Sequence, residues 1–299
     1  MKLNYLLMVF CTMLYSFHTC LLRQFKVIFP DNLSSDLLVC YQYIISIVIL
    51  SPFILRQASA VKSVLTRDNL PYLFIRCAMI FISTLSWFYV LSQVSAVNCI
   101  AISCMTPIFI LLLAKLSLKE LLPKEVLFLA IVAFSGAIVI ISPDPSGFNF
   151  ASLFAIFTAF LWAFNSTFTK KYLSSNASAM SIFFVTAVIL SLIALPYLLC
   201  KKHSISLSEI LYLIVVTLVF DIANILLIFV FSKGKIILVA PFDFLRVIFT
   251  TIFSSLLLSD PISEKTIVGI MIILFANTLS SVYGKKATIV KSIEQLNHK

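Results

Sequence analysis

The chain has 299 residues, of which 61% are hydrophobic and 11% are charged, and it carries a formal net charge of +10. A soluble domain of this length needs far more polar surface to cover itself, so the composition excludes an ordinary soluble protein. The basic excess would suit a nucleic-acid partner, but the positions of the charges, given below, exclude that class.

Ten apolar segments of about 20 residues follow one another along the chain, with short polar loops between them. Their predicted limits are 3–22, 37–55, 70–91, 94–114, 125–141, 149–169, 180–199, 209–231, 236–258 and 266–283. About 20 residues in helical conformation cross the hydrocarbon core of a bilayer once. The first segment lacks a small-residue cleavage site, so we expect it to remain as a helix. The sequence thus predicts an all-α membrane protein with ten transmembrane helices.

Lysine and arginine are distributed unevenly between the two sides of this predicted arrangement. With the N-terminus inside, the inside segments carry 15 of the 22 basic residues and the outside loops carry five, while Arg76 and Arg246 lie within spans. The positive-inside rule therefore predicts both termini in the cytoplasm. The basic charge reports membrane topology, and we expect a lipid bilayer and no nucleic acid as the partner.

Sequence motifs for catalysis or for metal binding are missing from the chain. The seven cysteines lie in or at the ends of apolar spans without a C-x-x-C pair, and the three histidines are scattered. There is no H-E-x-x-H, no G-x-S-x-G and no nucleotide-binding loop. We therefore expect no catalytic residue, no metal and no cofactor, which argues against a membrane enzyme and an ATP-driven pump.

The two halves of the chain are similar to each other. Residues 15–25 read YSFHTCLLRQF and residues 162–172 read WAFNSTFTKKY, and both Glu120 and Asp260 close a fourth span of their half. Such internal similarity indicates a duplicated unit of five helices, and because five is odd the second copy enters the membrane from the opposite side. The predicted domains are residues 1–143 and 144–284, followed by a basic cytoplasmic tail at 285–299. Inverted repeats of this kind bind substrate near the midplane, between the halves.

Several stretches of the chain resemble a known family. They are residues 87–98, 105–109 and 118–120 in the first half and 239–247 and 258–260 in the second. They look like the two EamA domains of the drug/metabolite transporter superfamily, and the resemblance covers residues 3–284. It implies inverted five-helix repeats around a central cavity, in the bacterial inner membrane. The A-P-F-D-F-x-R stretch at 240–246 resembles a bacterial subgroup, and the layout is similar to S-adenosylmethionine uptake carriers of intracellular bacteria. Asp260 departs from the family, which has glutamate there.

Ionisable residues inside the predicted spans are the main candidates for function, because each needs a partner or a water-filled cavity. Asp243 and Arg246 lie three residues apart on one helix face and predict either a structural salt bridge or a site for a charged substrate group. The sequence leaves three interpretations of Asp221 open: a proton-coupling site, a cation-binding group, or a partner of Arg76 or Arg246. Arg76 is expected to extend its charged end to the lipid headgroups, with binding of a substrate carboxylate as the alternative.

Polar and aromatic side chains in the spans form a second group of candidates. His18 and Asn165 occupy matching positions in the repeat, where each makes an interhelical hydrogen bond or contacts a ligand, and Asn98 follows the same reasoning. Trp87, Tyr89, Tyr15 and Trp162 either pack between helices or form a stacking wall for a flat ring. Pro107 and Pro241 are predicted inside helices, as bending points or static kinks.

These features predict a secondary transporter that moves a small organic metabolite by alternating access. The combination of arginine, aspartate and aromatic groups suits S-adenosylmethionine or a related zwitterionic, nucleoside-like metabolite. The alternatives are an exporter of amino acids or cationic drugs and, more distantly, a channel or a membrane protein that does not transport. The predicted partners are the substrate and the bilayer, while a coupling proton, an antiported metabolite and a homodimer stay open.

Overall fold

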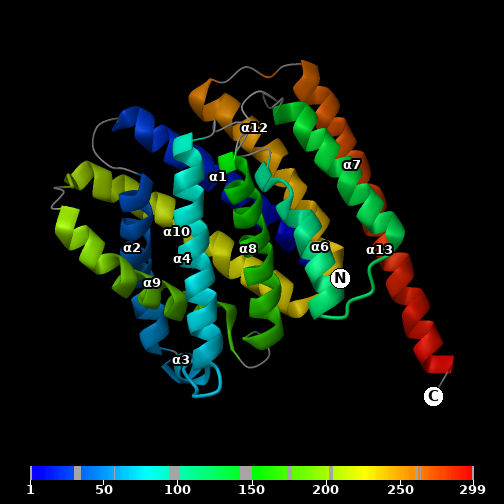
Figure 1. Ribbon diagram of the computed structural model, residues 1–299, viewed down its shortest axis with the longest axis horizontal. Coiled ribbons are helices and arrows are strands. Elements are labelled where there is room, and N and C mark those ends of the chain that lie inside the picture. Colours follow the sequence, from blue (N-terminus) through cyan, green and yellow to red (C-terminus); the bar gives the residue numbers. More distant parts are fainter. Residues whose placement is uncertain are drawn as a thin grey trace.

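The structure, a computed structural model, describes residues 2–29, 35–56, 58–93, 102–141, 150–173, 177–201, 205–259, 262 and 264–297. All secondary-structure elements within these ranges are helices (Figure 1). The elements are α1 (Lys2–Ile28), α2 (Ser35–Arg56), α3 (Ala58–Val64), α4 (Leu70–Gln93), α6 (Thr106–Ser117), α7 (Lys124–Ile141), α8 (Phe150–Tyr172), α9 (Ala179–Lys201), α10 (Leu207–Lys233), α11 (Ile236–Val239), the 3₁₀ helix η2 (Ala240–Phe244), α12 (Leu245–Leu258) and α13 (Glu264–Asn297).

Nine stretches of the described chain are helical, long and apolar enough to cross a bilayer, which confirms a helical membrane protein. The predicted fourth span, 94–114, is not among them. Residues 94–101 lie outside the described residues, and α6 has only 12 residues, or about 18 Å of helix, against about 30 Å of hydrocarbon. The tenth span therefore stays a prediction.

The predicted ninth span, 236–258, is a broken helix. It begins as α11, passes through the 3₁₀ turn η2 and continues as α12. Pro241 lies in the first turn of η2, and it interrupts the α-helix because it lacks an N–H and its ring clashes with a carbonyl one turn back. Pro107 lies in the first turn of α6, where a missing N–H costs nothing. Both prolines thus lie at helix starts, and the prediction that they lie inside helices is wrong.

The most extensive helix contacts join the first half of the chain to the second. α7 packs along α13, α2 along α9, α1 against α10 and α12, and both α4 and α6 against α8. Figure 1 shows α7 and α13 side by side along one edge of the bundle. α1 also packs against η2 and therefore lies beside both parts of the broken helix.

α7 and α13 meet backbone to backbone at two glycines. A Cβ atom at Gly136 would lie 3.0 Å from the carbonyl oxygen of Gly269, and one at Gly269 would lie 2.6 Å from that of Gly136. Neither position leaves room for a larger residue without a shift of the helices. Small residues at such crossings let membrane helices approach closely.

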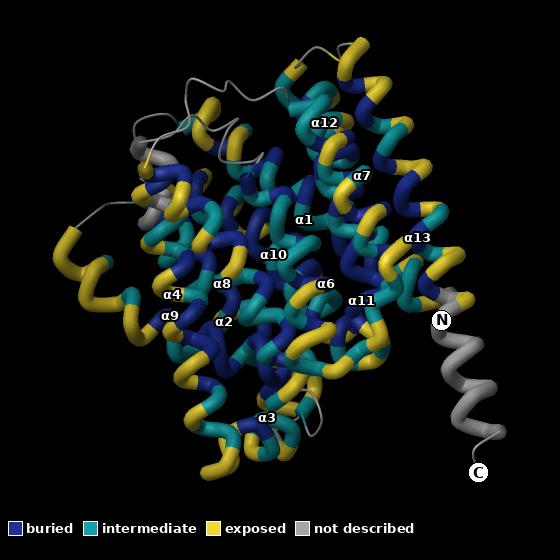
Figure 2. Tube along the Cα trace, turned by 45° about the vertical axis from the view of Figure 1, so that its right-hand side comes forward, coloured by how far each residue is buried: buried dark blue, intermediate teal, exposed yellow. Residues whose placement is uncertain are grey.

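The surface of the bundle is apolar, and many polar side chains are inside. Large hydrophobic side chains such as Leu55, Phe74 and Leu256 are exposed, whereas Ser46 and Thr158 are buried. In Figure 2 the exposed positions follow the outward faces of the helices. This distribution suits a protein surrounded by lipid tails, with its hydrogen-bonding groups turned to the centre.

Candidate functional site

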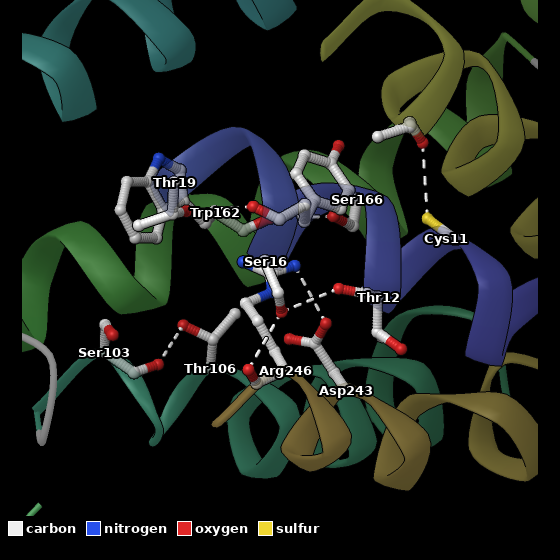
Figure 3. A network of polar contacts seen from close by, with 12 residues as sticks. Cys11, Thr12, Ser16, Thr19, Ser103, Thr106, Trp162, Ser166, Asp243 and Arg246 are labelled. Carbon is white, nitrogen blue, oxygen red and sulfur yellow. Dashed lines mark hydrogen bonds and ion pairs between the residues drawn. The ribbon is translucent and has the colours of Figure 1, made fainter. Parts of the chain in front are cut away.

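The break in the ninth span brings Asp243 and Arg246 against α1. Asp243 belongs to η2 and Arg246 to the first turn of α12, and Arg246 Nη2 donates a hydrogen bond to Asp243 Oδ1 at 2.8 Å. The guanidinium carbon lies 4.6 Å from the centre of the Tyr15 ring, a cation–π distance. The Ser16 hydroxyl donates to the Arg246 carbonyl oxygen at 2.9 Å (Figure 3). The ion pair therefore forms within one short segment, and side chains of α1 contact it.

The side chains of this pair are partly accessible although the neighbouring helix face is buried. The side chain of Arg246 is 38% accessible and that of Asp243 is 13% accessible, while Ser16 and Thr12 are fully buried. A single hydrogen bond joins the pair, and Arg246 Nη1 has no hydrogen-bond partner among the described residues. An arginine that still has a free N–H donor can bind an anionic group and keep its ion pair with the aspartate.

Arg76 lies inside the bundle, so the prediction that its charged end reaches the headgroups is wrong. The residue is only 5% exposed. Its Nε donates to Thr186 Oγ1 of α9 at 3.1 Å, and its Nη1 donates to Asn165 Oδ1 of α8 at 3.1 Å and to Thr169 Oγ1 of the same helix. Three helices, α4, α8 and α9, therefore hold this guanidinium.

Asp221 lies on α10 and is 2% exposed. It accepts a hydrogen bond of 2.6 Å from the Ser46 hydroxyl of α2 at Oδ1, whereas its Oδ2 is enclosed and has no partner in the described part of the chain. Neither Arg76 nor Arg246 forms an ion pair with it in those residues. The interpretation of Asp221 as an arginine partner is therefore wrong, and proton coupling and cation binding remain.

His18 and Asn165, which match in the predicted repeat, each make an interhelical hydrogen bond. His18 Nε2 lies 2.9 Å from Gln42 Nε2 of α2, and the imidazole packs on the Phe220 ring with centres 4.9 Å apart. Asn165 bonds to Arg76, as described above. His18 is 8% exposed, so it lines a packed contact between α1, α2 and α10.

The predicted aromatic candidates separate into two groups. Trp87 of α4 and Trp162 of α8 pack against each other, with ring centres 5.3 Å apart and planes tilted by 50°. Tyr89 is 46% exposed and packs edge-on against Phe154. Trp162 and Ser166 are one turn apart on α8, and the Ser166 hydroxyl donates to the Trp162 carbonyl oxygen at 3.0 Å (Figure 3). Asn98 lies outside the described residues.

Two tyrosines connect the charged groups into one polar region. Tyr15 lies within electrostatic reach of the guanidinium groups of both Arg246 and Arg76. Tyr43 lies within reach of Arg76 and Asp221. We call the set of Tyr15, Tyr43, Arg76, Asp221, Asp243 and Arg246 the polar centre.

Several residues of the polar centre, and several side chains that bind to it, were not predicted from the sequence. Ser46, Thr169 and Thr186 hold the charged side chains, but hydroxyl residues are frequent in membrane helices and satisfy their own backbone there. Tyr43 is one of ten tyrosines, without a distinguishing neighbour. Among the described residues, no group of three His, Cys, Asp or Glu side chains could hold a metal ion.

Comparisons with known proteins agree with this architecture. The sequence profile of the EamA-like transporter family matches residues 2–142 and 149–282. A solved structure described only as "Crystal structure of protein" superposes with a TM-score of 0.81, over 96% of this chain and 99% of that one. Its sequence identity is 14%, so this likeness shows the fold alone.

Three named transporters are similar to this chain at low sequence identity. The S-adenosylmethionine uptake transporter of Rickettsia bellii is 25% identical over 254 residues, 85% of each chain. The riboflavin transporter of Brucella anthropi is 29% identical over 46% of this chain and 48% of that one. The pseudopaline exporter CntI of Pseudomonas aeruginosa is 25% identical over 48% of this chain and 49% of that one.

Proposed function

Because the chain belongs to the EamA-like transporter family and is a transporter of small metabolites, we propose that it works by alternating access of two inverted five-helix halves. The polar centre lies between these halves and binds the substrate. Transport then requires no chemical change of the substrate, and the protein acts as a carrier.

The pattern of helix contacts supports two halves related by a pseudo-twofold axis. In a repeat of five spans, α1, α2, α4, α6 and α7 correspond in order to α8, α9, α10, α11–α12 and α13. The pair α1 with α10 then corresponds to α8 with α4, and α1 with α12 corresponds to α8 with α6. The pairs α2 with α9 and α7 with α13 each contain both copies of one helix. A twofold relation between two copies produces this reciprocity.

The ends of the corresponding fourth spans support the same relation. Lys119 follows α6 and Ser259 follows α12, and these are the two described non-glycine residues with positive φ, at 53° and 57°. A left-handed residue at this place lets the chain turn back directly after a helix. Both residues precede an acidic residue, Glu120 or Asp260.

S-adenosylmethionine is the substrate that we propose first. Its carboxylate, amine and sulfonium, and its flat adenine ring find arginine, aspartate and aromatic side chains in and beside the polar centre. The accessible Asp243–Arg246 pair, next to the Tyr15 ring, carries this proposal, because it places a carboxylate for the cationic end of the substrate beside an aromatic face. The name of the Rickettsia bellii relative points to the same compound.

Export of an amino acid or a cationic drug is the second proposal. The exporter among the relatives favours it, since the family members that resemble this chain differ in the direction of transport. The charged pair alone serves an amino acid equally well, because such a substrate needs no aromatic wall.

We further propose that both termini lie in the cytoplasm of a bacterium, in its inner membrane. Lys170 contacts Glu120 and the Gly234 carbonyl, so the ends of α6, α8 and α10 meet. The charge distribution assigns all three ends to the cytoplasmic side. Their meeting at one end of the bundle supports that assignment.

Uptake of radiolabelled S-adenosylmethionine into cells that express the protein tests the substrate. We expect uptake above the vector control, with competition by S-adenosylhomocysteine and with stimulation by unlabelled substrate loaded inside. Stimulation from the opposite side is a property of carriers, so a channel would lack it. No uptake, together with robust transport of a plain amino acid, would leave the second proposal in its place.

A further inference from the structure

Arg76 is a buried cation without an acidic partner in the described structure. Its three hydrogen-bond acceptors, Thr186 Oγ1, Asn165 Oδ1 and Thr169 Oγ1, are all neutral. By contrast, Arg246 and Lys170 each pair with a carboxylate. A charge that is 5% exposed and surrounded by neutral groups keeps a strong preference for an anion.

The same hydrogen bonds leave one side of the guanidinium available. They use Nε and Nη1, whereas Nη2 donates to no described protein atom and is not among the enclosed atoms that lack a partner. Because α8 and α9 bind the other two nitrogens, the orientation of the guanidinium is fixed and Nη2 keeps its hydrogen atoms for another acceptor. A fixed and open arginine donor suits a ligand oxygen better than a mobile one does.

The location links this group to the polar centre. The Arg246 guanidinium lies 4.6 Å from the centre of the Tyr15 ring, and the charge of Arg76 also acts on Tyr15, so both cations belong to the surroundings of one tyrosine. Asp243 already pairs with Arg246, whereas Arg76 forms no ion pair with a carboxylate among the described residues. A carboxylate would neutralise the charge of Arg76, whereas a phosphate dianion would leave an excess negative charge in a low-dielectric interior.

We propose that Arg76, fixed by Asn165 and Thr186, is the subsite for the carboxylate of a zwitterionic substrate, and that Asp243 receives its cationic end. This inference rests on the proposed function. It assigns the two charged ends of the substrate to two different residues of the polar centre, and it makes Arg76 a determinant of specificity for acids over the corresponding amines.

The test compares a ligand with its analogue that lacks the carboxylate. Dissociation constants of S-adenosylmethionine and decarboxylated S-adenosylmethionine are measured on purified wild-type protein and on Arg76→Gln by ligand-induced thermal shift and competition. We expect the wild type to prefer the carboxylate form by roughly 10- to 100-fold, the worth of a charge-assisted hydrogen bond. In Arg76→Gln this preference disappears, while affinity for the decarboxylated compound changes little.

Two further variants test the same inference if Arg76→Gln folds poorly. Thr186→Val removes the acceptor of Arg76 Nε and is expected to reduce the preference several-fold in a folded protein. Thr217→Val is the matched control, because Thr217 is a buried threonine of α10 whose hydroxyl has no hydrogen-bond partner among the described residues, and it should leave the preference unchanged. Equal losses for both ligands in Arg76→Gln and Thr186→Val would overturn the inference and leave Arg76 a structural residue.

Failure of the proposed substrate gives a different result. If the wild type binds neither form of S-adenosylmethionine, that substrate is rejected, and the same comparison is made with arginine and agmatine, an amino acid and its decarboxylated amine. A wild type that prefers neither carboxylate-bearing ligand over its amine overturns the Arg76 inference.

Discussion

Glu120 and Lys170 form an ion pair of 2.7 Å that joins the turn after α6 to the last turn of α8. Glu120 also accepts hydrogen bonds from the backbone N–H groups of Ile236 at 3.2 Å and Ile237 at 3.0 Å. One carboxylate thus serves a cation and the otherwise free N–H groups at the start of α11. It fixes the beginning of the broken helix that carries Asp243.

Replacing Glu120 should therefore destabilise the protein. We expect Glu120→Ala to lower stability by about 1–3 kcal/mol, because Lys170 and two backbone donors lose their acceptor together. Thermal unfolding of the detergent-solubilised protein measures this change. Glu125→Ala, an exposed acidic residue at the start of α7, is the control and should have an effect within about 0.5 kcal/mol. Equal effects of the two variants would contradict the bridging role.

The Asp243–Arg246 pair should be needed for transport beyond its own salt bridge. Arg246→Ala leaves Asp243 uncompensated, and we expect uptake to fall by roughly 10- to 100-fold or more. The double exchange Asp243→Arg with Arg246→Asp restores an ion pair and should recover folding, as judged by size-exclusion chromatography, without recovering uptake. Normal transport by the double variant would reduce the pair to a structural salt bridge.

Asp221 is the residue that we propose for coupling to a proton. Asp221→Asn keeps an oxygen for the Ser46 hydroxyl but cannot change its charge. We expect this variant, reconstituted in liposomes, to exchange substrate across the membrane and to lose uphill accumulation driven by a pH gradient. Ser46→Ala, which leaves the carboxyl in place, should still accumulate substrate. Undiminished accumulation by Asp221→Asn would favour exchange for an antiported metabolite.

The contact between α7 and α13 should tolerate no side chain at Gly269. In Gly269→Ala the new Cβ would meet the Gly136 carbonyl oxygen at 2.6 Å, and backbone cannot move aside as a flexible side chain can. We expect a loss of about 1–3 kcal/mol in thermal stability. Met271→Ala, at a 64% exposed position of the same helix, is the matched control. Comparable unfolding temperatures for both variants would mean that the two helices separate without cost.

The proposed orientation can be checked by labelling single cysteines in a cysteine-free background. Thr66→Cys, between α3 and α4, should react with a membrane-impermeant maleimide only after the cells are opened. Ser208→Cys, at the start of α10, should react in intact cells. The reverse pattern would place the termini outside and contradict the positive-inside argument.

Local properties of the chain determined most of the fold. Whether a run of apolar residues is long enough to span a bilayer follows from its length and composition, so the sequence predicted the nine candidate spans found in the described part of the chain. The same holds for Asp243 and Arg246, since a spacing of three residues keeps them within contact in both an α-helix and a 3₁₀ turn. The family resemblance also lies in short local stretches, and the profile match confirms it.

Tertiary structure alone decided the surroundings of Arg76 and Asp221. The acceptors of Arg76 lie 89 to 110 residues away on two other helices, and Ser46 lies 175 residues from Asp221. Hydropathy reports how deep a residue lies in the membrane, but not whether it faces lipid or a neighbouring helix. That second property depends on how the helices pack around one another. The sequence therefore located these charges in the membrane, and only the packing of α2, α8, α9 and α10 determined what they contact.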